Sequence, residues 1–224
     1  MALKEYAMMP SQHYQDACDA IRAVTGATHL IKSGEMAGLI SSVKSGNDKW
    51  AKNIDALQFE LIPEDFANIS LIRNHAFMSS EVTSVEIPET IRGIGEGAFA
   101  DCWSLTNIWF PDSVTHINPS MCEGSAVKSV RLGSYTTRIG FKAFSATNIT
   151  EIDIPSAVTN IDGAAFATTS VLTVRMHSTT PPTVASTSFK SQNLSKIIVP
   201  KGSASTYKSA TNWSAFANFI VEAT

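Results

Sequence analysis

Residues 92–114 read RGIGEGAFADCWSLTNIWFPDSV, and residues 137–158 read TRIGFKAFSATNITEIDIPSAV. Both stretches contain an Ile-Gly pair, then an Ala-Phe pair, and then an alternating apolar run that ends at a proline. Agreement at this many positions is not expected by chance, so the two stretches are copies of one repeated unit. A repeat of this length indicates a solenoid, in which each unit forms one coil and stacks on the next.

The repeat continues on both sides of these copies and occupies residues 66–200 in six copies. One large apolar position recurs at intervals of 22 or 23 residues, at Phe77, Phe99, Met121, Phe144, Phe166 and Phe189. A second marker ends each apolar run, at Pro88, Pro111, Gly133, Pro155, His177 and Pro200. Proline suits the end of a strand because it cannot donate to the hydrogen-bond ladder.

Each copy predicts one β-strand, because apolar residues alternate just before the second marker and therefore share one face. These pairs are Val85 and Ile87, Ile108 and Phe110, Val130 and Leu132, Ile152 and Ile154, Val174 and Met176, and Ile197 and Val199. A second apolar column follows the turn, at Ile72, Ile94, Ile117, Ile139, Ile161 and Val184. Stacking would bury both columns in a parallel arrangement with strands about 4.8 Å apart, and the large apolar column would form an internal spine. Residues that tolerate left-handed backbone recur behind the second column, at Gly95, Asn118, Gly140 and Asp162.

The C-terminal residues 201–224 are richer in aromatic side chains than a linker, with Tyr207, Trp213, Phe216 and Phe219. A solenoid needs its exposed apolar end covered, so this segment predicts a cap with a short helix near residues 203–210.

The N-terminal residues 1–46 have no copy of the repeat. Two apolar helical faces predict a helical hairpin for attachment or oligomerisation. The first face contains Tyr14, Ala17, Cys18, Ile21 and Val24, and the second contains Met36, Leu39, Ile40 and Val43. Residues 47–65 form a connector. The predicted fold class is therefore α+β: a leucine-rich-repeat-like solenoid with a parallel β-sheet, preceded by this hairpin and closed by the C-terminal cap.

The composition limits the function classes. The 224 residues carry a net charge of −3 and 17% charged side chains, with no basic stripe of the kind that nucleic-acid binding requires. Three cysteines, Cys18, Cys102 and Cys122, form neither a CxxC motif nor an even set, so no disulfide framework or zinc site is predicted. No apolar stretch reaches transmembrane length, and the N-terminus carries no secretory signal pattern, so no membrane insertion is expected.

No catalytic motif is present in the sequence. The five histidines lack metal-ligand spacing, and no nucleophile or phosphate-loop motif occurs. Glu151 and Asp153 share a strand face, but one such pair on an open surface is better explained as solvated side chains than as a glycosidase pair. The sequence therefore predicts a protein without catalytic activity, cofactor or metal.

The outward-facing strand residues form the candidate binding site, at Glu86, Trp109, Arg131, Asp153 and Arg175. A large aromatic residue beside arginine on a flat sheet suits recognition of a glycan or a protein. The alternative interpretation is a ladder of exposed ion pairs, each contributing about 0–1 kcal/mol. A rival site is the loop edge after each strand, at Asp112, Ser134, Tyr135 and Ser178.

The copy at residues 92–114 resembles the BspA-type leucine-rich repeats, whose units read I-x-x-I-G-x-x-A-F-x-x-C-x-x-L-x-x-I-x-I-P-x-S-V. The resemblance covers about residues 66–200 and implies adhesion or recognition on bacterial, protist or phage surfaces. Copies three, five and six depart from the pattern at the proline, cysteine or Ile-Gly positions, which affects local coil shape rather than the fold.

Residues 14–43 resemble a segment near the start of some phage tail-associated proteins, matching at Asp19–Arg22, Thr25–Gly26, Ile31–Lys32 and Glu35–Ala37. This resemblance implies a phage tail or tail-fibre protein located in the virion. It also implies contact with a host-surface glycan or protein, with other virion proteins through the N-terminal hairpin, and with further copies of the chain, such as in a homotrimer. The alternatives are a bacterial cell-surface adhesin and a purely architectural virion subunit.

We predict that folding requires no metal or redox cofactor. Exhaustive chelation and reduction should leave the midpoint of thermal unfolding unchanged, because a structural metal would contribute directly to the free energy of folding. A large drop in the midpoint after chelation would reveal a metal site that the sequence does not disclose.

Overall fold

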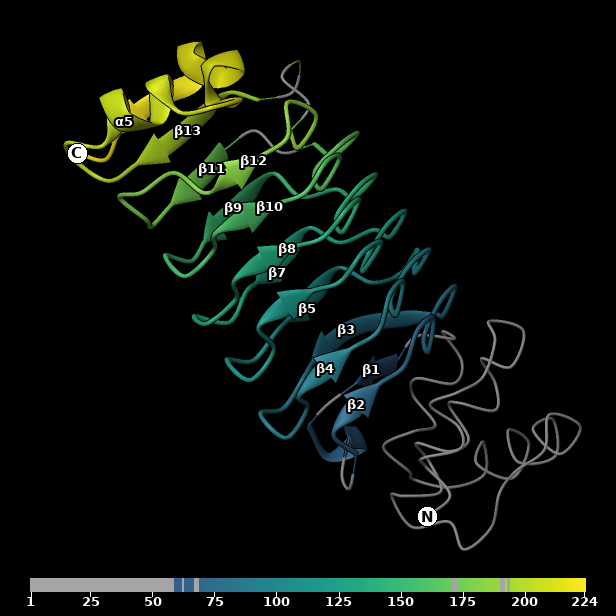
Figure 1. The fold of residues 1–224 in the computed structure, drawn as a ribbon. Coiled ribbons are helices and arrows are strands. Elements are labelled where there is room, and N and C mark those ends of the chain that lie inside the picture. Colours follow the sequence, from purple (N-terminus) through teal and green to yellow (C-terminus); the bar gives the residue numbers. More distant parts are fainter. Residues whose placement is uncertain (1–58, 62, 67–68, 171–172, 190–191, 193) are drawn as a thin grey trace, which may run out of the picture.

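The computed structural model describes residues 59–61, 63–66, 69–170, 173–189, 192 and 194–224, which wind as a β-solenoid along one axis (Figure 1). A first row contains β1 (Phe59–Leu61), β3 (Val82–Glu86), β5 (Asn107–Trp109), β7 (Ser129–Arg131), β9 (Glu151–Ile154), β11 (Thr173–Met176), β13 (Lys196–Val199) and β14 (Ile220–Glu222). A second row contains the shorter β2 (Leu71–Ile72), β4 (Gly93–Ile94), β6 (His116–Ile117), β8 (Arg138–Ile139), β10 (Asn160–Ile161) and β12 (Thr183–Val184).

Both rows are parallel, as the repeat predicts, but neither is one continuous sheet. The first row consists of sheet β1-β3-β5-β7 and sheet β9-β11-β13-β14. The second row consists of sheet β2-β4 and sheet β6-β8-β10-β12. Hydrogen-bond pairing therefore stops between β7 and β9 in the first row and between β4 and β6 in the second.

The predicted inward columns are confirmed. Register pairs Val85 with Ile108, and Ile108 with Val130, and these residues face the interior. All members of both apolar columns are buried except Val130, which is half-buried. In β5 and β9 the alternation gives one buried face and one exposed face.

The aromatic spine runs through the core beside these columns. Phe77 stacks on Phe99 with ring centroids 5.2 Å apart, and all spine phenylalanines are buried. Phe144 stacks on Phe166 at 5.5 Å, and Phe166 stacks on Phe189 at 5.3 Å. Stacked aromatic pairs contribute about 0.5–1.5 kcal/mol beyond the area that they bury, so the spine ties neighbouring coils together.

The prediction of Met121 as the spine residue of the third copy is wrong by one position. In every other copy the spine phenylalanine follows the second-row Ile or Val by five residues, and the same count from Ile117 reaches Cys122. The backbone agrees, because the Cys122 N–H donates to the carbonyl of Ala143, the residue before Phe144. The error arose because the third copy carries Met-Cys where most copies carry Ala-Phe.

Left-handed backbone occurs two residues after the predicted column. The φ angles are positive at Gly97, Ser120, Lys142 and Ala164, and not at the predicted Gly95, Asn118, Gly140 and Asp162. Gly95 is required for a different reason: a Cβ atom there would lie 2.2 Å from the backbone nitrogen of Asn74 in the preceding coil. Close approach between coils, rather than a left-handed turn, explains this glycine.

The described residues contain little helix, so the predicted α+β class is replaced by a parallel-sheet β-solenoid. The helical elements with described bounds are the 3₁₀ turn η2 (Pro63–Phe66), the helix α5 (Ala204–Ser209) and the 3₁₀ helix η4 (Trp213–Phe219). In the five coils that follow β2, β4, β6, β8 and β10, the third side passes through left-handed turns instead of a helix. The predicted hairpin of residues 1–46, and most of the connector at residues 47–65, lie outside the described residues.

Aromatic side chains close the described solenoid at both ends. At the C-terminal end, where a cap is predicted, α5 and η4 bury Tyr207, Trp213 and Phe216. The Phe216 ring meets Phe189 edge-on, with centroids 5.6 Å apart. At the other end, the η2 residue Phe66 meets Phe77 edge-on at 6.4 Å. The two ends of the spine are thus covered in the same way.

We expect Phe144→Ala to destabilise the fold by about 3–5 kcal/mol, because the ring is fully buried and stacks on Phe166. Chemical denaturation followed by circular dichroism measures the change. Phe141→Ala is a matched control, since Phe141 is 50% exposed and should alter stability by less than about 0.5 kcal/mol. Equal stability of the two variants would contradict the prediction that the Phe144 ring stabilises the fold as part of the spine.

We also expect Cys102 to resist alkylation in the folded protein. Burial raises the pKa of its thiol to about 11, and burial raises the pKa of Cys122 as well. Two pKa units lower the reactive thiolate fraction near pH 8 by about 100-fold, and exclusion of the reagent slows the reaction further. Peptide mass spectrometry after iodoacetamide treatment should find both cysteines unmodified in the native protein and modified after unfolding. Rapid native labelling at either position would mean that its coil opens.

Candidate functional site

The five candidate residues lie on the outer face of the first row, in two separate blocks. Trp109 pairs in register with Glu86 on one side and Arg131 on the other, within sheet β1-β3-β5-β7. Asp153 pairs with Arg175 in the other sheet. Because pairing stops between β7 and β9, the ladder does not join Arg131 to Asp153.

Trp109 stands on a rigid support. Its sequence neighbours Ile108 and Phe110 point inward and are buried in the core. Its carbonyl accepts from the Ile87 N–H at 3.2 Å, and the Phe110 N–H donates to the Arg131 carbonyl at 2.8 Å. Trp109 itself is 44% exposed, so a large apolar surface faces solvent from a backbone that is fixed on both sides.

The charged residues of the two blocks differ in their partners. Asp153 accepts from the Arg175 guanidinium at 3.3 Å and lies 2.9 Å from Nε2 of His177. The predicted ion-pair ladder is therefore present in this block, with His177 as a member that the sequence did not indicate. Among the described residues, the side chains of Glu86 and Arg131 have no hydrogen-bond or ion-pair partner.

The rival loop edge is largely occupied by contacts between coils. The Glu89 carboxylate accepts from the backbone N–H groups of Asp112 and Ser113, each at 3.0 Å. Asp112 in turn accepts from the Ser134 N–H at 2.6 Å. Tyr135 differs, because its side chain is 65% exposed.

Ser178, the last member of the rival edge, is also tied into the structure. Its hydroxyl donates to the Thr180 carbonyl at 2.8 Å, and its own carbonyl accepts from the Tyr207 hydroxyl at 2.8 Å. The loop edge thus contributes mainly to coil stacking and to seating the cap, and Tyr135 is the member with a large exposed surface.

Trp103 is an exposed aromatic residue that the sequence analysis did not single out. It is 75% exposed in the segment that leads into β5. The equivalent positions in the neighbouring copies are Glu81, Ala126 and Asn148, which are polar or small. A comparison of this column across the copies would have shown that Trp103 is unusual there.

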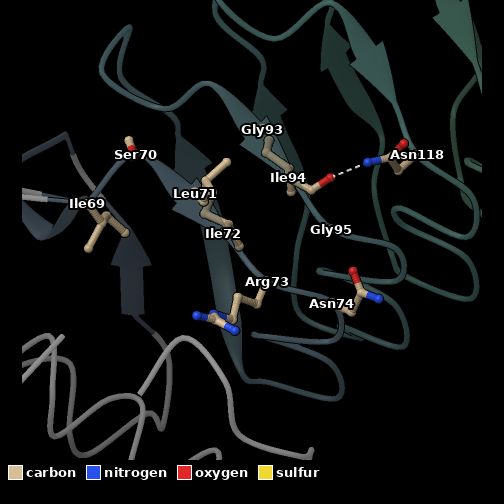
Figure 2. A pocket seen from close by; sticks show the side chains of 10 residues that line it. All are labelled: Ile69, Ser70, Leu71, Ile72, Arg73, Asn74, Gly93, Ile94, Gly95 and Asn118. Atoms are coloured by element: carbon tan, nitrogen blue, oxygen red, sulfur yellow. Dashed lines mark hydrogen bonds between the residues drawn. The ribbon is translucent and has the colours of Figure 1, made fainter. Parts of the chain in front are cut away.

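An open cavity with a volume of about 880 Å³ lies on the second row over β2 and β4 and reaches Asn118, which follows β6 (Figure 2). Its lining consists of Ile69, Ser70, Leu71, Ile72, Arg73, Asn74, Gly93, Ile94, Gly95 and Asn118. The Asn118 side chain donates to the Ile94 carbonyl at 2.6 Å across the interruption. Among the described residues of the lining, Arg73 alone carries a charge, so these residues provide no acid–base pair.

In the part of the chain that the structure describes, no group of three or more His, Cys, Asp or Glu side chains could hold a metal ion. None of the helices in that part is long and apolar enough to cross a lipid bilayer. Glu151 and Asp153 are both exposed, and Asp153 is engaged by Arg175 and His177.

Comparison with solved structures finds other leucine-rich repeat proteins. A leucine-rich repeat protein from Bacteroides ovatus is 29% identical with a TM-score of 0.50, and the match covers 65% of this chain and 42% of that one. A leucine-rich repeat protein of T. pallidum is 24% identical with a TM-score of 0.45, covering 53% and 58%. A leucine-rich cell surface protein of Faecalibacterium prausnitzii is 16% identical with a TM-score of 0.29, covering 70% and 83%. The chain thus spans less than half the length of the B. ovatus protein.

Comparison by sequence agrees with the repeat. No curated protein matches the chain. None of the comparisons supports the resemblance of residues 14–43 to phage tail-associated proteins. A family model described as the BspA type leucine rich repeat region matches residues 70–195 in 6 copies. Since this match spans more than half of the sequence, and its residues lie within the stacked coils, the chain belongs to the BspA-type leucine-rich repeat family.

Proposed function

We propose that this protein is a non-catalytic recognition module that binds a surface glycan or protein through Glu86, Trp109 and Arg131. The observation that carries the proposal is the exposed Trp109 ring, held on a fixed sheet between two charged side chains that have no partner among the described residues. Asp153 and Arg175, which satisfy each other, then belong to the framework beside the site.

Rigidity favours binding at this place. Ordering side chains and loops on association costs free energy and so weakens binding. A residue that the ladder fixes on both sides needs little further ordering. Tryptophan and arginine are also the residue types most enriched among positions where truncation weakens binding strongly. A solvated ladder of ion pairs does not account for this block, because Glu86 and Arg131 form no pair.

The proposed setting is a biological surface, as the family's frequent occurrence on cell surfaces suggests. A bacterial adhesin and a phage tail or tail-fibre protein both fit such a module. The phage setting has its support in residues 14–43, which the family model does not reach. A purely architectural subunit is the competing function, and it predicts no binding to any surface component.

We expect the double variant Trp109→Ala, Arg131→Ala to bind its surface component about 30-fold more weakly than the native chain, since anchors of this type lose 2 kcal/mol or more on truncation. Binding would be measured on glycan arrays, surface-protein arrays and whole bacterial cells. Both substitutions remove exposed side chains, so the thermal unfolding midpoint should stay within a few degrees of the native value.

The matched control is Asp153→Ala, Arg175→Ala, which removes a charged pair from the same face and should leave binding unchanged. Equal loss in both double variants would mean that the whole face acts through its charge rather than through Trp109. Unchanged binding in the Trp109 variant would place the site elsewhere, with Trp103 and Tyr135 as the next positions to substitute.

A further inference from the structure

The outward-facing column of first-row strand residues contains charges that form an ion pair in one block and charges that do not in the other. In the β9–β11 block, Asp153 is neutralised by Arg175 from the neighbouring strand. In the β3–β7 block, Glu86 and Arg131 also carry opposite charges, but Trp109 lies in register between them. Two strand spacings, about 9.6 Å, separate the backbones of Glu86 and Arg131. Among the described residues neither side chain has an ion-pair partner, so both charges are open to a ligand.

We infer that the partner of this face is a protein segment in extended conformation that lies along the solenoid axis. It places a basic side chain over Glu86, an apolar side chain over Trp109 and an acidic side chain over Arg131. This inference rests on the proposed function, and it specifies the class and the orientation of the partner.

Charge complementarity selects a protein over other surface components. A neutral glycan carries neither of the two charges, and a polyanion such as a nucleic acid or an acidic glycan would meet repulsion at Glu86. A polypeptide supplies both signs around an apolar residue. Complementary charges on an interface also set the orientation of the partner, because like charges brought together lower the affinity.

The spacing fits an extended segment. In a polyproline II chain, which is extended and has three residues per turn, residues three positions apart lie on the same edge and are about 9.3 Å apart, close to the two strand spacings between Glu86 and Arg131. A basic residue and an acidic residue three positions apart can therefore reach both charges, while an intervening side chain on the neighbouring edge covers Trp109. The segment runs across the strands, so the site reads side chains and does not extend the sheet by backbone pairing.

Two further exposed aromatic residues lie in the same coils as the Glu86–Trp109–Arg131 block. Trp103 precedes β5 and is 75% exposed, and Tyr135 follows β7 and is 65% exposed. Corresponding positions around the β9–β11 block carry small or polar residues, such as Asn148 and Ala157. Exposed aromatic residues of this kind are enriched at protein interfaces.

The experiment is a selection of displayed random 12-residue peptides on the full chain, followed by affinity measurements with the selected peptides synthesised individually. Selected peptides should carry a basic and an acidic residue three positions apart with an apolar residue between them. Trp109→Ala should weaken their binding at least about tenfold. The charge-exchanged variant Glu86→Arg, Arg131→Glu should bind them at least about tenfold more weakly and should select peptides with the opposite charge order.

The matched control is Asp153→Arg, Arg175→Glu, which exchanges an internally paired set on the same face and should leave peptide affinity unchanged. The inference is overturned if no peptide is selected, or if peptide affinity is the same in the charge-exchanged variant and the native chain. A glycan that binds the native chain, loses affinity with Trp109→Ala and ignores the charge exchange would also overturn it, while supporting the proposed function. If Trp109→Ala affects neither peptide nor glycan binding, the proposed function fails as well.

Discussion

The hydrogen-bond ladder between successive coils is the interaction on which the rest of the structure depends. A single coil of 22 or 23 residues exposes two apolar columns and a spine residue, and it cannot bury them within itself. Pairing with the next coil covers these side chains and at the same time fixes the spacing between strands. The spine stacking of Phe144 on Phe166, and the aromatic closure of both ends, follow from that spacing.

The same ladder makes the outer face a suitable binding surface. Because the inward residues lock each strand, the outward residues occupy fixed positions, and Trp109 presents its ring without needing to be ordered. Where the ladder stops, the character of the face changes. Before the stop, Trp109 separates Glu86 from Arg131, and after it, Asp153 and Arg175 lie on adjacent strands and pair.

The third copy shows how the ladder tolerates a change of sequence. Met121 and Cys122 replace the usual Ala-Phe pair, and both are fully buried. A larger residue at the alanine position accompanies a smaller one at the phenylalanine position, so the total side-chain volume of the coil changes little. Phe110, which directly follows β5 in the preceding coil, meets Phe144 edge-on at 6.4 Å, and this adds an aromatic contact in the part of the core where the spine lacks a ring.

The sequence by itself determined the period, the parallel strands, both inward columns and five of the six spine residues, because each depends on a local pattern that recurs in every copy. It also placed Glu86, Trp109 and Arg131 on one face, since alternation along a strand decides the face. The five-residue count from Ile117 also places Cys122 in the spine, and the hydrogen bond from its N–H to the Ala143 carbonyl in the next coil agrees. Only the tertiary structure decided that pairing stops between β7 and β9, because pairing depends on contacts between coils. The tertiary structure also decided which charges are paired: Asp153 meets Arg175 and His177, residues 22 and 24 positions away, and neither distance is encoded within one coil.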